Sequence, residues 1–369
     1  MSRKYIVLTM SLLILGRVLA AQGSGRPAVS GGIYDKPYIH KSGHGTAIGG
    51  YMDLEWEINP DENTFNQHRL IPFIFSEITP WLHFSTELEF EETGEEIKVE
   101  YATLDMKINQ WLTYRGGLIL SPLGKFNMVH DSPWNDLVSR PLVDQQLIPT
   151  TLSEPGMGFT GTLYPSSVSV LGYEIYLVNG FNGDMLMNPD EVRIREGRGE
   201  PEDNNRAKSL VSRIVYSPFL GLELGASLHT GNYADAGNRN LTIGAMDATY
   251  QKGATELLLE GAVARIDLPD GSARLQTGYY LQPNYHFGFG WIPGFPDSKF
   301  TAMLRAGAVD FNANATGDIR IRYSTGINWR PIEDTVFKTE YALESTAPAG
   351  SDRTGGFDPV FYFGFASYF

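Results

Sequence analysis

The stretch IRIRYSTGINWR, residues 319–330, alternates between two kinds of side chain. Ile319, Ile321, Tyr323, Ile327 and Trp329 fall on one face of an extended chain, because successive side chains of a strand point to opposite sides. The other face carries arginines and small or polar residues. This pattern predicts a strand of about ten residues with an apolar and a polar face, the length that a tilted strand needs to cross a bilayer.

The same alternation recurs along the chain, for example in YMDLEWEI (residues 51–58) and WLHFSTELEFEE (residues 81–92). We find about sixteen such segments, and bacterial outer-membrane barrels have an even number of strands. The phase of the alternation is ambiguous in the second, fourth and tenth segments, which predicts β-bulges there. The expected strands span residues 46–58, 64–78, 81–92, 96–108, 111–121, 156–164, 168–179, 208–217, 221–230, 240–250, 254–266, 273–285, 299–310, 318–330, 335–345 and 358–369.

The expected connections also alternate, between tight turns and a set that includes long loops at 122–155, 180–207 and 346–357. Short turns at one end and long loops at the other are typical of a transmembrane barrel. The connection at 286–298 is long although it falls at the short-turn end, and the pattern does not explain it. A soluble β-sandwich is the alternative, and it would have loops of similar length at both ends.

The chain ends on FDPVFYFGFASYF, residues 357–369, which predicts a strand with one aromatic face. This strand must pair with the first, because lipid cannot satisfy the hydrogen bonds of an open sheet edge. A terminal strand that ends on Phe also resembles the signal that the barrel-assembly machinery recognises. The barrel-closing residues of the aromatic face are Phe361, Phe363, Phe365 and Phe369.

The first residues have the layout of a secretory signal peptide: a basic start, an apolar run and a small-residue site at residues 18–20. We therefore expect residues 1–21 to be a signal peptide, 22–45 a short periplasmic segment and 46–369 the barrel. No later segment is long and apolar enough for a membrane helix, and the chain has no cysteine. The net charge of −14 disfavours nucleic acid as a partner. The expected location is the bacterial outer membrane, in contact with its lipid and lipopolysaccharide.

If the apolar face of each strand meets lipid, the alternate face lines a water-filled lumen. Acidic and basic residues then occupy different parts of the wall, which would create a transverse field across the pore. The alternative is that these charges hydrate the lumen or pair across neighbouring strands. The expected acidic lining is Asp53, Glu55, Glu57, Glu87, Glu89, Glu91 and Glu100, and the expected basic lining is Arg115, Arg274, Arg305, Arg320, Arg322 and Arg330.

The segment RGGLILSPLGKF, residues 115–126, runs from a strand into a long loop and resembles the phosphate-selective porins of bacterial outer membranes. The resemblance implies a homotrimer of sixteen-stranded pores, each narrowed by a third loop folded into the lumen. That loop is 122–155, and its apolar motifs WNDL, PLV and QQLIP favour packing against the inner wall. Its charges are mixed, which predicts modest selectivity. The expected constriction residues are Lys125, Asp131, Asp136, Arg140 and Asp144.

The sequence thus predicts a porin for passive diffusion of small hydrophilic solutes or ions, with anions such as phosphate implied by the resemblance. Arg320 and Arg322 are among the groups expected to attract anions, and removing residues 127–150 should raise the conductance. No catalytic residue, metal ligand or cofactor is expected. The charged run MNPDEVRIREGRGEPEDNN, residues 187–205, is typical of a solvated surface. Two alternatives remain: a lipid hydrolase built on a barrel, and a non-conducting structural or adhesin barrel.

Overall fold

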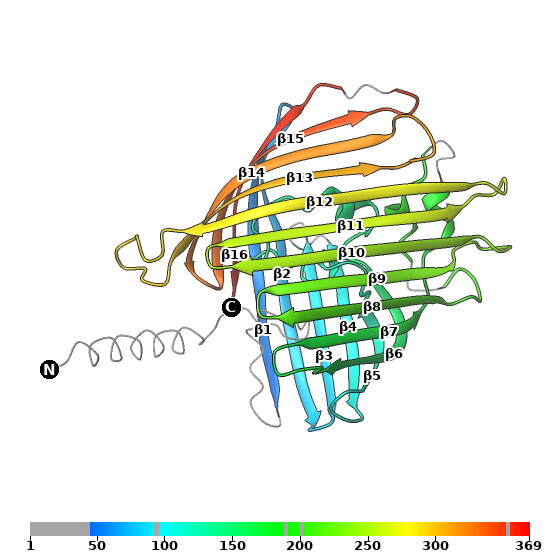
Figure 1. Cartoon of the computed structure of the whole chain (residues 1–369), viewed down its shortest axis with the longest axis horizontal. Helices are drawn as coiled ribbons and strands as arrows, with labels where there is room; N and C mark the ends of the chain where they lie inside the picture. The colour runs from blue at the N-terminus through cyan, green and yellow to red at the C-terminus, as the bar shows by residue number, and fades with distance from the viewer. Residues whose placement is uncertain (1–44, 92–93, 95, 188–190, 200–202, 352–354) are drawn as a thin grey trace.

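Sixteen antiparallel strands form one closed barrel in the computed structural model of the chain (Figure 1). The structure describes residues 45–91, 94, 96–187, 191–199, 203–351 and 355–369. Each strand pairs with the next in sequence, and the last pairs with the first. The predicted signal peptide and nearly all of the predicted periplasmic segment lie outside the described residues.

The strands fall where the alternation predicts them, within a few residues at each end. Both the all-β class and the count of sixteen are therefore confirmed. The strands are β1 (Thr46–Ile58), β2 (Asn63–Thr79), β3 (Leu82–Glu91), β4 (Glu96–Lys107), β5 (Thr113–Leu120), β6 (Ser153–Leu163), β7 (Val170–Val178), β8 (Ser209–Phe219), β9 (Leu222–Asn232), β10 (Asn240–Lys252), β11 (Thr255–Asp267), β12 (Ala273–Phe287), β13 (Lys299–Asp310), β14 (Ile319–Ile332), β15 (Thr335–Ala347) and β16 (Asp358–Tyr368).

Two of the three predicted bulges are present. The pairing of β2 shifts register against both neighbours, and β4 carries one extra residue, Glu100, where it pairs with β3. The prediction is wrong for β10, whose pairing is continuous on both sides. Its phase looks ambiguous because the inner face carries the buried apolar residues Leu241, Ile243 and Ala245 in place of polar ones.

Barrel closure takes place along β1 and β16, in a register that runs from Tyr51 opposite Tyr368 to Ile58 opposite Phe361. Phe369 continues this pairing through two backbone hydrogen bonds with Gly50, of 2.9 and 3.2 Å. Every strand therefore has a partner on both sides, and no edge of the sheet is left open.

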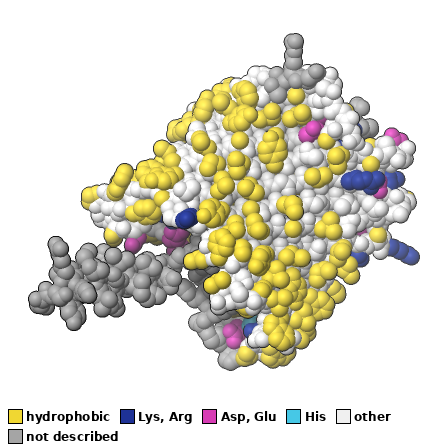
Figure 2. All heavy atoms as spheres, in the orientation of Figure 1, with side chains coloured by type: hydrophobic (Ala, Val, Ile, Leu, Met, Phe, Trp, Pro, Cys, Tyr) yellow, Lys and Arg dark blue, Asp and Glu magenta, His cyan; other side chains and the backbone are white. Residues whose placement is uncertain are grey.

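The outer surface of the barrel is apolar over its middle (Figure 2). Met246, Leu304 and Ile327 point outward from three strands with 72%, 59% and 52% of their surface exposed. In the view of Figure 2, basic side chains gather at the end where the longer loops lie. Contiguous apolar surface of this extent is unfavourable in water, because each exposed apolar Å² costs roughly 25 cal/mol, but it matches a bilayer.

A hydrophobic core lies inside the barrel, against the inner faces of β10 to β13. Leu142, Val143, Leu147 and Ile148 from the segment between β5 and β6 are fully buried in it. These residues belong to the PLV and QQLIP motifs of the predicted third loop. Helical turns order the two long segments: η3 (Phe126–Met128), α2 (Leu142–Gln146), η4 (Gly183–Leu186) and η5 (Ile194–Gly197). None of the helices in the described residues is long and apolar enough to cross a bilayer.

The segment between β7 and β8 contributes to the same core, which corrects the expectation of a solvated surface run for residues 192–194 of the 187–205 stretch. Val192 and Ile194 are buried in the core. The charged side chain between them, Arg193, pairs with Asp318 at 2.8 Å, and its guanidinium group lies 4.0 Å from the centre of the Phe311 ring. The alternation of apolar and charged residues here therefore reflects packing on one side and ion pairing on the other.

Gly117 in the RGG motif of β5 adopts a backbone φ of +135°, which L side chains rarely take. A Cβ atom at this position would approach the Ala102 carbonyl oxygen of β4 to 2.1 Å. The motif thus needs glycine to keep β5 paired with β4 immediately before the chain turns into the barrel.

Candidate functional site

The segment between β5 and β6, residues 121–152, is held against the inner wall by hydrogen bonds to strands far apart in the sequence. The backbone N–H groups of Lys125 and Phe126 donate to the Glu260 carboxylate on β11, both at 3.0 Å. The backbone N–H and hydroxyl of Ser139 donate to Glu340 on β15, at 2.8 and 2.6 Å. These strands lie at separate places around the barrel, so the segment runs along its inner side.

Three of the predicted constriction charges anchor this segment to the wall. Lys125 donates to Glu223 on β9 at 2.8 Å, and the Tyr368 hydroxyl of β16 donates to Asp131 at 3.0 Å. Asp136 accepts from Asn284 at 2.8 Å and lies 3.4 Å from Arg330. Their charges are therefore used for attachment, and only Arg140 of the predicted set lines the cavity described below.

Asp144, the fifth predicted constriction residue, lies in the first turn of α2 and is fully buried. Neither of its carboxylate oxygens has a hydrogen-bond partner among the described residues. Burial and the nearby charge of Glu260 raise the pKa of Asp144 well above its usual range. This carboxyl is therefore stabilised in its neutral form inside the apolar core.

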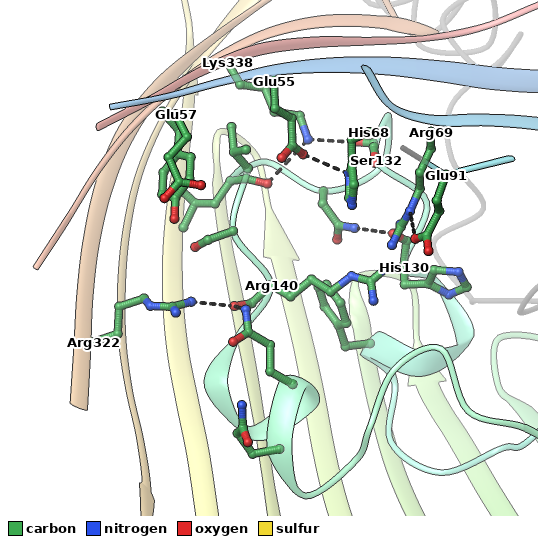
Figure 3. Close-up of a pocket in the computed structure, with 18 of the residues that line it drawn as sticks. Glu55, Glu57, His68, Arg69, Glu91, His130, Ser132, Arg140, Arg322 and Lys338 are labelled. Atoms are coloured by element: carbon green, nitrogen blue, oxygen red, sulfur yellow. Dashed lines mark hydrogen bonds and ion pairs between the residues drawn. The ribbon is translucent and has the colours of Figure 1, made fainter. Parts of the chain in front are cut away.

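A polar cavity of about 400 Å³ lies between this segment and the wall (Figure 3). Its sides come from β1 to β3, from β14 to β16, and from the segments that connect β5 to β6 and β7 to β8. Residues distant in the sequence therefore meet there. Of the predicted lining, the structure brings Glu55, Glu57, Glu91, Arg140 and Arg322 to this cavity. It also places there several side chains that we did not predict: His68, Arg69, His130, Arg195, Lys338 and Tyr362.

The carboxylates of the cavity have nearby polar partners. Glu55 lies 3.2 Å from the His68 ring nitrogen, and Glu91 lies 3.2 Å from Arg69. Behind them, Asp53 accepts from the backbone N–H of Arg69 at 2.7 Å and from the Ser132 hydroxyl. Asp53, Glu55 and His68 each place one metal-ligand atom within 4.8 Å of the others, but these atoms already contact one another or protein donors.

Three cations of the cavity are held by carbonyl groups instead of carboxylates. The Lys338 ammonium donates to the Ser132 carbonyl at 2.7 Å, and Arg140 donates to the Thr150 carbonyl at 2.8 Å. Arg195 donates to the Gln145 and Thr150 carbonyls at 3.1 and 3.2 Å. A carbonyl satisfies a hydrogen bond but carries no net charge, so it does not neutralise the cation that it binds.

Burial and a second cation also act on Arg195. Burial and the neighbouring Arg198 guanidinium lower the pKa of Arg195 from its usual value. An arginine stays protonated in proteins despite such a shift, so the group remains a cation at the cavity.

The other predicted basic residues, except Arg274, lie beside carboxylates. Arg322 is 2.5 Å from Glu344, and Arg320 is 3.6 Å from the same group. Arg305 lies 3.6 Å from Glu340 and 2.7 Å from the Ser139 carbonyl. Arg115 pairs with Asp105 on β4 at 2.6 Å, and Arg274 lies near the long-loop end of β12. Pairing with carboxylates therefore describes five of the six predicted basic residues better than an open arc does, and three of them pair across neighbouring strands.

The predicted acidic residues Glu87, Glu89 and Glu100 are buried outside the cavity. Glu89 lies 3.0 Å from Arg69, and Glu100 lies 2.5 Å from His130 of the inner segment. Burial disfavours the charged imidazole, but the Glu100 carboxylate outweighs it and raises the pKa of His130. The bulge residue of β4 thus helps to fix the inner segment.

Strand alternation could have located some of the cavity residues that we did not predict. Lys338 and Glu340 alternate with the outward Phe337 and Tyr341, so TVFKTEY already placed them on the inner face. His68 and Arg69 are adjacent in β2, where the register shift obscures the phase. Arg195 could not be placed, because its position depends on how a long segment folds inside the barrel.

Comparison with known proteins agrees with this architecture. The barrel is similar to that of OmpT, an outer membrane protein of Vibrio cholerae in a trimer form, with a TM-score of 0.58 over 88% of this chain and 99% of that one at 12% identity. It is also similar to the anion-selective porin from Comamonas acidovorans, with a TM-score of 0.58, coverages of 88% and 99%, and 10% identity. The outer membrane channel DcaP of Acinetobacter baumannii gives a TM-score of 0.56, coverages of 89% and 99%, and 9% identity.

In sequence, an uncharacterized protein of Aquifex aeolicus is 31% identical over 216 residues, which are 55% of this chain and 48% of that protein. This chain therefore matches about half the length of that relative. No protein-family model matches the chain. The likenesses show the fold of outer-membrane porins and support the porin part of the resemblance, whereas the phosphate-selective type stays a prediction.

Proposed function

We propose that this protein is a passive outer-membrane channel for small hydrophilic solutes, narrowed by residues 121–152. The closed barrel has an apolar exterior, and the polar cavity between this segment and the wall supplies water-compatible surface inside it. The hydrogen bonds to Glu260 and Glu340 support a constriction that is fixed in place. The absence of catalytic activity stays a prediction.

We further propose that the constriction favours anions. The observation that carries this proposal is that the cations and the carboxylates of the cavity have different kinds of partner. Lys338, Arg140 and Arg195 are bound by carbonyls, whereas Glu55 and Glu91 lie beside basic side chains. An anion that enters the cavity would therefore meet cations whose hydrogen bonds go to neutral carbonyls, and these cations can replace part of its hydration shell.

The test is the reversal potential of the channel in a salt gradient across a planar bilayer. We expect preference for the anion in the wild type and a shift toward cations in Lys338→Met, Arg140→Gln and Arg195→Gln. The shift should be larger at 0.01 M than at 1 M salt, because the screening length falls from about 30 Å to about 3 Å. Arg265→Gln is the matched control, since Arg265 has 60% of its side chain exposed on β11 and lies outside the cavity. Cation preference in the wild type would contradict the proposal.

The remaining expectations from the sequence are also proposals. We propose export by residues 1–21, assembly through recognition of the C-terminal strand, contact with lipopolysaccharide, and a homotrimer. The Vibrio cholerae protein of similar fold is known in a trimer form, which supports the last of these. The mass of the detergent-solubilised protein, measured before and after heating, tests it. A folded species with the mass of a single chain would contradict the trimer.

A further inference from the structure

The connection between β12 and β13, residues 288–298, is the exception among the short turns. Figure 1 shows it projecting beyond the neighbouring turns at that end of the barrel. The adjacent turns β10–β11 and β14–β15 each leave only two residues between strands, 253–254 and 333–334. A connection of this length is not needed to join two antiparallel strands.

The connection is an ordered turn. The Gly290 N–H donates to the Ser298 carbonyl at 2.8 Å, and the Phe295 N–H donates to the Ile292 carbonyl at 3.0 Å. Gly288 and Gly290 adopt φ values of +68° and +66°, which let the chain double back. The turn is therefore a shaped feature whose side chains have defined positions.

A row of aromatic side chains crosses the outer surface beside this turn. Strand register places Phe287, Phe300, Trp329, Phe337 and Phe365 opposite one another on five successive strands, β12 to β16. The ring centres of consecutive members are 5.4 to 6.0 Å apart where contacts are recorded. Such a row at the short-turn end matches the aromatic girdle that barrels place at a membrane interface.

The turn lies against this row and presents further aromatic surface. The Trp291 ring lies 5.9 Å from Phe287, and the Phe295 ring lies 5.3 Å from Trp329. Phe289 and Trp291 nevertheless keep 63% and 68% of their surface exposed. The hydrophobic side chains of this projecting turn are visible in Figure 2, where they continue from the apolar outer surface.

We propose that the 288–298 turn is a membrane-interface anchor, which inserts Phe289, Trp291 and Phe295 into the boundary between phospholipid headgroups and acyl chains. We infer that the turn contacts lipid because it extends the aromatic row of the apolar outer surface. Tryptophan favours this boundary because its ring is apolar and its N–H is polar. Three charged residues adjoin the turn: Asp297 is exposed, and Lys299 pairs with Glu333 at 2.9 Å, so we place their side of the turn in water. This inference rests on the proposed membrane location.

A labelling experiment tests the anchor, and it is simple because the chain has no cysteine. Trp291→Cys is labelled with an environment-sensitive fluorophore in the full-length protein and reconstituted into phosphatidylcholine vesicles. A fraction of the lipid carries a spin label, a contact quencher, near the headgroup. Lys252→Cys, at the exposed last residue of β10 beside the β10–β11 turn, is the control for the same end of the barrel. Leu304→Cys, outward on β13, is the control for membrane insertion.

We expect at least a twofold stronger lipid quenching at position 291 than at position 252, with little quenching by aqueous iodide. If position 304 is not quenched by lipid labels along the acyl chain, the membrane location itself fails. If position 304 is quenched but 291 is quenched only by iodide, the anchor is refuted. The fluorophore at position 291 could instead quench itself, and this self-quenching could disappear when labelled protein is diluted with unlabelled protein. That result would mean that the turn contacts a second copy of the chain, and it would also refute the anchor. Phe289→Cys repeats the measurement if Trp291→Cys does not fold.

Discussion

The partner of each charged side chain decides whether it can act on a solute. A cation in direct contact with a carboxylate contributes little net field, whereas the hydrogen bonds of the Lys338 ammonium go to the neutral carbonyls of Ser132 and Leu137. This distinction moves the expected anion attraction away from Arg320 and Arg322, which share Glu344. Sequence alternation can place a side chain on the inner face, but it cannot show what the side chain pairs with.

Arg320→Ser should therefore change the reversal potential less than Lys338→Met does. The Arg320 side chain lies near Glu344 and outside the cavity, so its removal alters the net charge at the constriction little. Reversal potentials of the two variants at low salt check this. An equal or larger shift for Arg320→Ser would mean that the wall near the long loops, and not the cavity, sets selectivity.

The buried Asp144 predicts a pH dependence of stability. Burial and Glu260 raise the pKa of Asp144, so the folded state holds its proton more tightly than the unfolded state does. Its contribution is most favourable below the ordinary carboxyl pKa of about 4 and is lost as pH rises toward the folded value. The gain in stability of Asp144→Asn over the wild type should be larger at pH 8 than at pH 4, by roughly 1–3 kcal/mol at most. Thermal unfolding of both proteins across this range measures the effect, and parallel pH profiles would contradict it.

At the scale of the element, alternation was sufficient to locate the strands, because lipid on one side and water on the other impose a period of two. It failed in β10, where the inner face meets packed apolar segments in place of water. The inner segments themselves could not be placed from sequence, since their path depends on contacts such as Ser139 with Glu340, more than 200 positions apart in the chain.

Gly117→Ala tests the backbone requirement at the entry to the inner segment. The substitution forces a Cβ atom onto the Ala102 carbonyl at a φ of +135°, so we expect a loss of more than about 1 kcal/mol of stability. Gly172→Ala in β7 is the matched control, because a Cβ there meets no atom within 4 Å. Urea unfolding of both variants provides the comparison. Equal stability would show that β5 can shift away from β4 at no cost.

The whole molecule combines a membrane barrel with an apolar core on one side of its interior. Residues 142–148 pack into this core, so removing 127–150, as the sequence alone suggests, would expose the apolar faces of β10 to β13 to water. A change confined to residues 132–140 removes much of the cavity wall and keeps the packed anchor. Such a change also removes the wall contacts of Asp136 and Ser139, so the packing of residues 142–148 in the core and the hydrogen bonds to Glu260 are what hold the rest of the segment in place.

Single-channel conductance of that variant tests the central claim most directly. We replace residues 132–140 with a short Gly-Ser link and compare it with the wild type in planar bilayers. The control replaces the exposed residues 313–316, between β13 and β14, with the same kind of link. We predict discrete conductance steps in the wild type, larger steps in the 132–140 variant and unchanged steps in the control. A wild type that opens no channels, or a 132–140 variant with unchanged conductance, would contradict a pore narrowed by this segment.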